Sequence, residues 1–373
     1  MQKNSPFFTY SKIIFNIGGA ILIPAFIISS LSGFLNPIIF RGITFFAIGF
    51  PILLVAAFVW CLLCATIFYP GKWWCFLFLL LGTENLFKTY PFRAETAFTV
   101  SKDSNTLRVV SWNVNEFLYG EAGDNSWVEK QKSMLDFLKS MDADVLCFQD
   151  YIVSPGYAER DVTKFMKDSL GFTYYFFSMD DLDYGTIIFS KYPITDSARV
   201  KYKLSSHPES VAHADINVKG KSFRIFTTHF KSMFLHHNTL TPELLGDLKY
   251  VKEDTALLFH SNMAERLEYF DRIHTKQALL VLQEFEKTKT PFIFCADLNS
   301  VPASYVYHSL RKNTKDAYLE AGSGLRGTYR SAKSLLRIDV ILTSKNLKTT
   351  QFNSPSLELS DHYPLIADIK LAN

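Results

Sequence analysis

Hydrophobic residues are concentrated near the start of the chain, in two long runs that contain no charged residue. The first run extends from Ile13 to Phe40 and the second from Gly42 to Tyr69. A helix needs about 20 apolar residues to cross the hydrocarbon core of a bilayer, and each run exceeds that length. The pattern therefore predicts transmembrane helices at about 13–34 and 43–68, the second of which ends at a Tyr69-Pro70-Gly71 turn signal.

A third apolar run, 73–82, is shorter, and extending it to about 73–87 buries Glu84 near an interface. Trp73 and Trp74 beside Lys72 are typical of an interfacial anchor. We expect a third span here, with a re-entrant or interfacial helix as the alternative. A cleaved signal peptide would explain the first run and leave the second unexplained. We therefore expect residues 1–94 to be a multi-pass anchor in the cell membrane, in contact with the lipid bilayer.

The side of the membrane on which the rest of the chain lies stays open. Lys and Arg are evenly divided between the two predicted faces, so the positive-inside rule does not choose an orientation. An odd number of spans would place the C-terminal part opposite the N-terminus. Residues 95–106 are polar and unpatterned, which is typical of a linker.

From Leu107 to the end of the chain, short apolar runs alternate with amphipathic segments. Continuous apolar runs bounded by polar residues predict strands buried on both faces. Helices follow some strands and hairpins join others, so we expect an α/β fold for 107–373, a two-sheet sandwich flanked by helices. The predicted strands are 107–112, 144–149, 174–178, 186–190, 213–217, 223–228, 292–296, 339–343 and 365–370.

Composition narrows the choice of partner. Only nine charged residues fall in the first 102, and the remainder of the chain is close to neutral. A domain dedicated to duplex DNA usually has a basic excess, because phosphate contacts dominate its affinity. The five Cys residues form neither a disulfide framework nor a zinc spacing and are read as small buried hydrophobes. Residues 231–275 look like an insertion, and its His236-His237 pair is interpreted as part of a solvated loop.

Polar and acidic residues directly follow several of the predicted strands, and the carboxyl ends of strands are where layered α/β folds bind ligands. Each short motif alone is weak, since Asp-x-Asn after a strand is more often a turn. Seven motifs in one order carry more weight: Ser-Trp-Asn-Val (111–114), Phe-Gln-Asp (148–150), Tyr-Gly-Thr-Ile-Ile-Phe-Ser-Lys-Tyr-Pro-Ile (184–194), Thr-Thr-His-Phe (227–230), Ala-Asp-Leu-Asn-Ser-Val-Pro (296–302), Arg-Ile-Asp-Val-Ile-Leu (337–342) and Ser-Asp-His-Tyr-Pro (360–364).

In these motifs the chain, from about Leu107 to Asn373, resembles the endonuclease/exonuclease/phosphatase superfamily, and with its apolar N-terminus it resembles membrane-anchored bacterial members. The resemblance implies a hydrolase that cleaves a phosphodiester or phosphomonoester by in-line attack of an activated water. It also implies a hard divalent cation, Mg²⁺ with Mn²⁺ as the alternative. By similarity Asp150 is the principal metal ligand, helped by Asn113, with Asp361 in or beside the metal site.

The resemblance also implies roles for the remaining motif residues. Asp297 would orient or deprotonate the attacking water, and Asn299 would hold the phosphate. His362, steered by Asp339, would act as a general acid or base or would stabilise charge on the phosphate. His229 would contact a non-bridging oxygen or support the leaving group. For Arg337 a role at the site and an ion pair within the domain both stay open.

Position 150 departs from the family pattern, which usually has Glu there. Asp is one methylene shorter, so its oxygens lie about 1.5 Å further back unless the backbone compensates. Three functions stay open on sequence: a membrane-anchored phosphoesterase acting on a lipid or small-molecule phosphate, a membrane-tethered endo- or exonuclease, and a catalytically degenerate binding protein on the same fold. The substrate is in each case a phosphate ester, and no protein partner is inferable.

Overall fold

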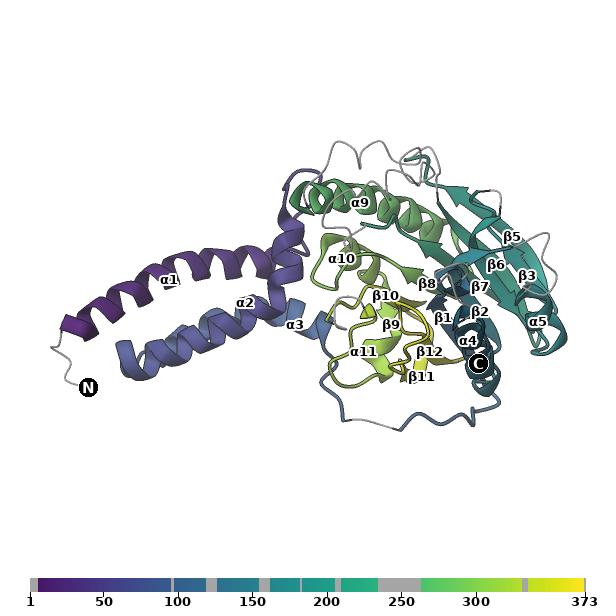
Figure 1. Cartoon of the computed structure of the whole chain (residues 1–373), viewed down its shortest axis with the longest axis horizontal. Coiled ribbons are helices and arrows are strands. Elements are labelled where there is room, and N and C mark those ends of the chain that lie inside the picture. Colours follow the sequence, from purple (N-terminus) through teal and green to yellow (C-terminus); the bar gives the residue numbers. More distant parts are fainter. Residues whose placement is uncertain are drawn as a thin grey trace.

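Two β-sheets pack face to face, helices cover their outer faces, and two long helices extend away from one side (Figure 1). The computed structural model describes residues 6–94, 97–118, 126–153, 162–181, 183–204, 209–233, 263–330 and 335–371. This architecture confirms the α/β sandwich expected from the strand pattern. Most of the predicted insertion, with its His236-His237 pair, lies outside the described residues.

The first sheet has six strands in the order β11-β12-β1-β2-β4-β3. Its central pair, β1 and β2, is parallel, and the other neighbouring strands are antiparallel. The bounds are β1 Thr106–Asn113, β2 Val145–Ile152, β3 Tyr174–Phe177, β4 Tyr184–Ser190, β11 Lys348–Asn353 and β12 Leu365–Lys370.

The second sheet also has six strands, in the order β5-β6-β7-β8-β10-β9, with β7 and β8 parallel. The two sheets thus each have a parallel pair at their centre. The bounds are β5 Ile194–Lys201, β6 Ser210–Val218, β7 Lys221–His229, β8 Phe292–Asp297, β9 Thr314–Asp316 and β10 Asp339–Ser344.

The apolar runs that predicted the strands are buried on both faces, as expected. Between the sheets lies one hydrophobic cluster that includes Val109, Cys147, Ile225 and Cys295. Alternate residues point outward into two further clusters, where helices cover each sheet. Burial of both faces is why these strands read as continuous apolar runs. All five Cys residues are buried and unpaired, as their spacing predicted.

Two helices cover the outer face of each sheet. Met134 and Leu138 of α4 (Ser126–Ser140) and Met166 of α5 (Val162–Asp168) pack on the outer face of the first sheet. Val281 of α9 (Met263–Lys287) and Val306 of α10 (Tyr305–Arg311) pack on the second. A short helix, α11 (Ala317–Ala321), directly follows β9.

Three strands were missed by the sequence analysis: β5, β9 and β11. Each is an outer strand of its sheet, and β5 and β11 carry many partly or fully exposed residues. An outer strand has one unpaired edge and a solvated face, so it does not need the apolar run that identifies a central strand. A search for apolar runs therefore does not detect these three strands.

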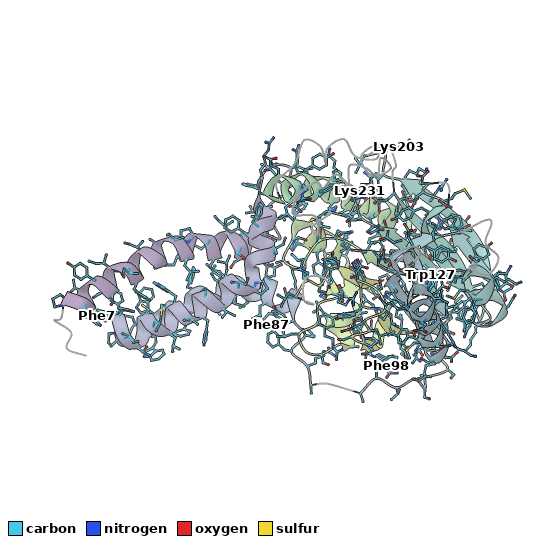
Figure 2. The ribbon with its side chains drawn as sticks, viewed as in Figure 1. Phe7, Phe87, Phe98, Trp127, Lys203 and Lys231 are labelled. Carbon is cyan, nitrogen blue, oxygen red and sulfur yellow. The ribbon has the colours of Figure 1, made fainter. Side chains whose placement is uncertain are left out.

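The N-terminal region forms a helical hairpin outside the sandwich. Helix α1 (Pro6–Leu31) packs against α2 (Ile43–Leu63), which continues as a π-helix at Cys64–Phe68. Both are long and apolar enough to cross a membrane, at 26 residues each counting the extension of α2. Their outer surface carries exposed apolar side chains such as Phe7, which is 67% exposed (Figure 2).

The third apolar segment runs back along this hairpin toward the sandwich. Residues Trp73–Gly82 form a 3-10 helix, and α3 (Thr83–Thr89) continues it. A 3-10 helix rises about 2.0 Å per residue and an α-helix about 1.5 Å, so the 10 and 7 residues together cover about 30 Å. The stretched geometry lets a short segment match the length of the longer helices beside it.

Polar side chains fasten the hairpin to the sandwich at one end. Asn85 donates hydrogen bonds to the carbonyl oxygens of Ser29 and Ser30, at 2.9 and 3.2 Å. Ser32 donates to the carbonyl of Ala303, just before α10, at 2.6 Å. All of these polar groups are buried. Because buried polar groups are costly to leave unpaired, these bonds tie α3 to α1 and the end of α1 to the segment before α10.

Candidate active site

The predicted site residues meet at one edge of the sandwich because both parallel strand pairs end there. Asn113 is the last residue of β1, His229 of β7 and Asp297 of β8. The side-chain nitrogen of Asn113 donates across the gap between the sheets to Asp297 Oδ2, at 3.1 Å. The two sheets therefore contribute to a single site, as the positions at the strand ends predicted.

Strand register brings the second sheet's residues side by side. His229 is the ladder partner of Asp297 between β7 and β8, and Asp297 is the ladder partner of Asp339 between β8 and β10. Ladder partners on neighbouring strands lie about 5 Å apart at Cα. Three residues separated by up to 110 positions in sequence are thus fixed within one side-chain length of one another.

A β-bulge aims Asp150 at this edge. The register of β2 against β4 shifts between Phe148 and Tyr151, and Asp150 has a positive φ of 49°. A bulge bends its strand and redirects a side chain, and Asp tolerates the left-handed region better than most residues. The bulge and the positive φ thus set the direction of the Asp150 side chain.

Three groups hold the Asp150 carboxylate. Asn113 donates to Oδ2 at 3.0 Å, and the hydroxyl of Tyr184 donates to Oδ1. His229 Nδ1 lies 2.9 Å from Oδ1 as an ion pair. Burial by itself raises the pKa of Asp150, but the charge of His229 and these hydrogen bonds outweigh it and hold the pKa well below its usual range. Asp150 is therefore a carboxylate at neutral pH.

His229 is the positive partner in this arrangement. Burial lowers its pKa, but the charge of Asp150 and the contact with it dominate and raise the pKa to about 10. Although Nδ1 is close to Asp150, it is outside hydrogen-bond geometry and is a buried nitrogen without a hydrogen-bond partner among the described residues. His229 is thus held by charge and leaves a donor at the site that is not fully satisfied.

Nitrogen donors converge on one oxygen of Asp297. Nε2 of His229 and Nε2 of His362 each lie 3.6 Å from Asp297 Oδ2, and Asn113 donates to the same atom. Burial, and then the charge of Asp339, raise the pKa of Asp297 to about 6, while both imidazoles oppose that rise. A carboxyl with a pKa near neutrality can accept a proton during a reaction cycle and release it again.

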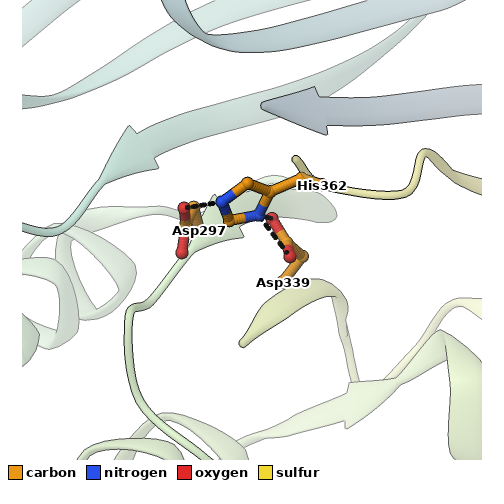
Figure 3. A group of neighbouring side chains, drawn as sticks. All are labelled: Asp297, Asp339 and His362. Carbon is orange, nitrogen blue, oxygen red and sulfur yellow. Dashed lines mark hydrogen bonds and ion pairs between the residues drawn. The ribbon is translucent and has the colours of Figure 1, made fainter. Parts of the chain in front are cut away.

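His362 is oriented by Asp339 (Figure 3). Its Nδ1 lies 2.9 and 3.1 Å from the two oxygens of Asp339, on the side of the ring opposite Asp297. Burial lowers the pKa of His362, but Asp339 and Asp297 raise it to about 10. The peptide nitrogens of Ile338 and Asp339 donate to Thr328 Oγ1, which fixes the start of β10. His362 therefore presents a protonated Nε2 to the site.

Asn299 completes the rim beside His229. Its backbone has a positive φ of 46°, and its peptide nitrogen donates to Asp297 Oδ1 at 2.9 Å. The side-chain nitrogen lies 3.2 Å from His229 Nε2 and donates to the carbonyl of Phe230 at 2.9 Å. Strained backbone at Asn299 and Asp150 alike is typical of positions whose side chains are aimed for function.

Asp361 is hydrogen-bonded to Ser360, its neighbour in the chain. Its Oδ1 is 3.2 Å from Ser360 Oγ, which also donates to the carbonyl of Asn113 at 2.9 Å. Its charge contributes to the raised pKa of His362. No described contact joins Asp361 to Asp150, so its predicted role at the metal stays a prediction.

Two positions at the site offer ligands for a divalent cation. Ligand atoms of Asp297, Asp339 and His362 lie within 4.8 Å of one another. These side chains are 1, 4 and 6% exposed, and His362 Nδ1 is already bonded to Asp339. The side chain of Asp150 is 22% exposed. Mg²⁺ gives up its waters reluctantly, so it suits the open carboxylate of Asp150 better than the closed cluster.

The structure also places residues that the sequence analysis left open or missed. Arg337 pairs with Asp316 at 2.8 Å and donates to the carbonyl of Lys88 at 3.0 Å, so it is an internal ion pair. Tyr184 was overlooked although it begins one of the quoted motifs. Tyr329, whose ring lies 5.0 Å from that of His362, belongs to no quoted motif, and only the tertiary structure locates it.

Comparison with known proteins agrees with this geometry. A sequence profile of the Endonuclease/Exonuclease/phosphatase family matches residues 110–362. No curated protein matches the sequence significantly. The fold is similar to that of an endonuclease/exonuclease/phosphatase from Bacteroides vulgatus, with a TM-score of 0.52 at 18% identity over 71% of this chain and 99% of that one.

Two eukaryotic structures are similar to a comparable extent. One is D. rerio TDP2 complexed with a single-strand DNA product, with a TM-score of 0.51 and 18% identity over 72% of this chain and 100% of that one. The other is the human Nocturnin catalytic domain with a bound sulfate anion, with a TM-score of 0.50 and 21% identity over 71% of this chain and 93% of that one. The profile match covers more than half of the chain, contains the first six motifs whole and reaches Asp361 and His362 of the seventh; the chain therefore belongs to the endonuclease/exonuclease/phosphatase family, a class of hydrolases that act on phosphate ester bonds.

Proposed function

We propose that this protein is a membrane-anchored, metal-dependent phosphoesterase that hydrolyses a phosphodiester or phosphomonoester by in-line attack of water. The observation that carries the proposal is the pair of imidazoles, His229 and His362, each 3.6 Å from the same oxygen of Asp297. His229 ends β7 and His362 lies in the segment before β12, and each imidazole has a raised pKa. Transfer of a phosphoryl group to water is favoured by a group that accepts the proton of the water and by donors that stabilise the negative charge on the phosphate oxygens.

The proposed roles follow from these contacts. Asp297, with a pKa of about 6, orients the attacking water and takes its proton. His362 donates from Nε2 to a non-bridging phosphate oxygen, and Asp339 holds its ring in the orientation this requires. His229 and Asn299 lie side by side at the rim, where they bind the phosphate and support the leaving group. These donors stabilise charge where it develops in the transition state.

The donor set suits a hard cation. Asp150 supplies an ionised, partly exposed carboxylate, and Asn113 is the adjacent amide. As placed, Asn113 offers its nitrogen to Asp150, so coordination through its oxygen requires the amide to turn over, an orientation assigned from hydrogen bonding. A bound Mg²⁺ or Mn²⁺ would neutralise phosphate charge at this position. Asp361 is proposed as a further carboxylate near the ion.

The N-terminal hairpin supports anchoring with three crossings. Phe8 of α1 stacks on Phe68, with ring centroids 6.0 Å apart, at the end far from the sandwich. Ser29 of α1 bonds the carbonyl of Phe46 at the near end. The chain leaves α2 at the far end and must return to the sandwich, so if α1 and α2 cross a bilayer the segment at Trp73–Thr89 crosses it too. Three crossings place the catalytic domain opposite the N-terminus.

The test uses full-length protein in detergent with bis(4-nitrophenyl) phosphate as substrate. We expect hydrolysis that is abolished by excess chelator and restored by Mg²⁺ or Mn²⁺. His362→Ala and Asp297→Ala should each lower kcat at least 1,000-fold, since they remove charge stabilisation and the proton acceptor. His213 is a buried histidine whose ring meets that of Phe226 edge to face in the second sheet, so His213→Gln is the matched control and should retain activity.

Two outcomes contradict the proposal. Activity that persists in excess chelator would exclude the metal mechanism. Absence of any metal-stimulated hydrolysis, on this substrate and on a panel of plasmid DNA, inositol phosphates and phospholipids, would favour a degenerate binding protein on the same fold. Preference within that panel would separate a nuclease from a phosphoesterase acting on lipid or small-molecule phosphates.

A further inference from the structure

A cavity adjoins the candidate active site on the side that faces the N-terminal hairpin. It has an empty volume of about 520 Å³, part of it open to solvent. Asn299 and Tyr329, which contact His229 and His362 respectively, form part of its wall. Thr44 and Ile48 of α2 form the opposite wall. A segment from the membrane anchor thus lies across the cavity from two residues at the catalytic rim.

A second cavity continues the first toward the hairpin. Its empty volume is about 730 Å³, and it shares Ile48, Val301 and Leu336 with the first. Because the same three side chains line both, the two cavities adjoin and together form one surface along α2. This "α2 groove" runs from the catalytic rim along α2.

The α2 groove is lined mainly by apolar side chains and opens beside exposed ones. Phe50 and Pro51 of α2 line its outer section, opposite a loop that carries Leu325 and Leu335. Those two leucines are 77 and 79% exposed, the highest values among the exposed large hydrophobic side chains of the described residues. Ile52, the next residue of α2, is 75% exposed. Exposed apolar surface of this kind marks contact with a membrane or an apolar ligand.

The location of the groove favours a chain that enters from a bilayer. Its outer wall is a helix long and apolar enough to cross a membrane, and its inner end is polar, with Ser300, Ser304 and Asp271 as well as Asn299. A water-soluble phosphate ester would gain nothing from the apolar section. A molecule with a hydrocarbon chain and a phosphate head would match both ends, since apolar burial stabilises the chain and the polar end receives the head.

We infer that the α2 groove binds the hydrocarbon chain of a membrane lipid phosphoester, with its phosphate at His229 and His362. The inference rests on the proposed hydrolase function and names the substrate class for that site. Helix α2 is then a part of the substrate site as well as an anchor, because Ile48 contributes to the wall of both cavities.

The experiment compares two substrates that share one reaction. Full-length protein in lipid nanodiscs is assayed with methyl and octyl esters of 4-nitrophenyl phosphate, which differ only in the chain. Burying one methylene contributes about fourfold in affinity, so partial burial of seven should raise kcat/KM for the octyl ester at least tenfold. Ile48→Trp and Leu336→Trp fill the groove from opposite walls. Each should lower the octyl-to-methyl ratio at least fivefold and leave the methyl ester within twofold of wild type.

Val55→Trp is the matched control. Val55 is 62% exposed on the same helix, lines neither cavity and lies about 10 Å further along the axis. Partition of the octyl ester into the nanodisc is common to all variants, so their ratios can be compared directly. An octyl-to-methyl ratio near one in wild type, an unchanged ratio in both groove variants, or an equal loss in Val55→Trp would overturn the inference. Absence of metal-dependent hydrolysis of the methyl ester would instead overturn the proposed function.

Discussion

Replacing Asp150 with Glu tests whether the site has been built around the shorter carboxylate. The substitution adds one methylene and moves the oxygens about 1.5 Å along the side chain. In the structure those oxygens already lie 3.0 Å from Asn113 Nδ2 and 2.9 Å from His229 Nδ1, with the Tyr184 hydroxyl on the same carboxylate. A Glu carboxylate cannot move forward by that distance without displacing at least one of these partners.

The size of the expected loss in Asp150→Glu follows from the hydrogen bonds that the longer side chain would displace. A hydrogen bond to a charged group contributes about 1.5–3 kcal/mol, and each 1.4 kcal/mol is a factor of ten. Loss of one such contact therefore lowers metal affinity or kcat about 10–100-fold in Asp150→Glu. Adding Tyr184→Phe removes the hydroxyl from the same carboxylate and leaves space beside it. We expect the double variant to recover part of the lost activity, although Tyr184→Phe alone lowers it.

The assay is hydrolysis of bis(4-nitrophenyl) phosphate over a Mg²⁺ titration. The titration separates a weaker metal site, where saturating Mg²⁺ restores kcat, from misplaced chemistry, where it does not. Asp150→Glu with wild-type or higher activity would refute the reasoning, because it would show that the usual family residue fits unchanged. Additive effects in the double variant would also contradict it, since they would mean that the two side chains do not compete for one space.

Three further predictions concern stability and topology. Burial raises the pKa of Asp271, whose side chain hydrogen-bonds Thr44, to about 6, so this carboxyl ionises first in the unfolded state and the free energy of unfolding falls as pH rises from about 4 to 6. Asp271→Asn should therefore raise the free energy of unfolding by up to about 3 kcal/mol at pH 8 and leave it unchanged at pH 4. An equal gain at both pH values in thermal unfolding would exclude this cause. Arg108 and Asp368 form a buried ion pair at 2.6 Å. Arg108→Met leaves Asp368 buried without its partner and should lower the free energy of unfolding by about 3–5 kcal/mol, whereas Arg108→Met with Asp368→Leu should lower it much less. Equal losses for the two variants in urea unfolding would show that the pairing is unimportant. Three crossings predict that tags at the two termini are digested from opposite faces of sealed vesicles, whereas digestion of both from one face would require an even number.

The central strands could be predicted from the sequence because burial on both faces requires a short run of apolar residues. Strands covered on both faces, such as β1 and β8, are mostly apolar, and their short apolar runs identify them in the sequence. The two membrane-length helices were recognisable for a related reason, since only a lipid or core environment tolerates so many consecutive apolar residues. Outer strands such as β11 lack this constraint and were missed.

Motif order predicted which residues would form the site, and the structure brings Asn113, Asp150, His229, Asp297 and their neighbours to one edge. What the motifs could not give was the position of each carboxylate. Whether Asp150 reaches its partners depends on a bulge in β2, which sequence letters do not record. Tyr184 donates to it from a different strand, through register alone.

The sequence by itself determined the chemical inventory of this protein: an apolar N-terminal region, an α/β sandwich, and the acidic and imidazole groups of a phosphate ester hydrolase. The first two follow from residue type and short-range pattern, and the third from the order of the motifs. Only the tertiary structure decided that the N-terminal hairpin packs beside the candidate site and that α2 lines the cavities there. That placement depends on contacts between residues far apart in the chain, such as Ser32 with Ala303, which no local pattern encodes.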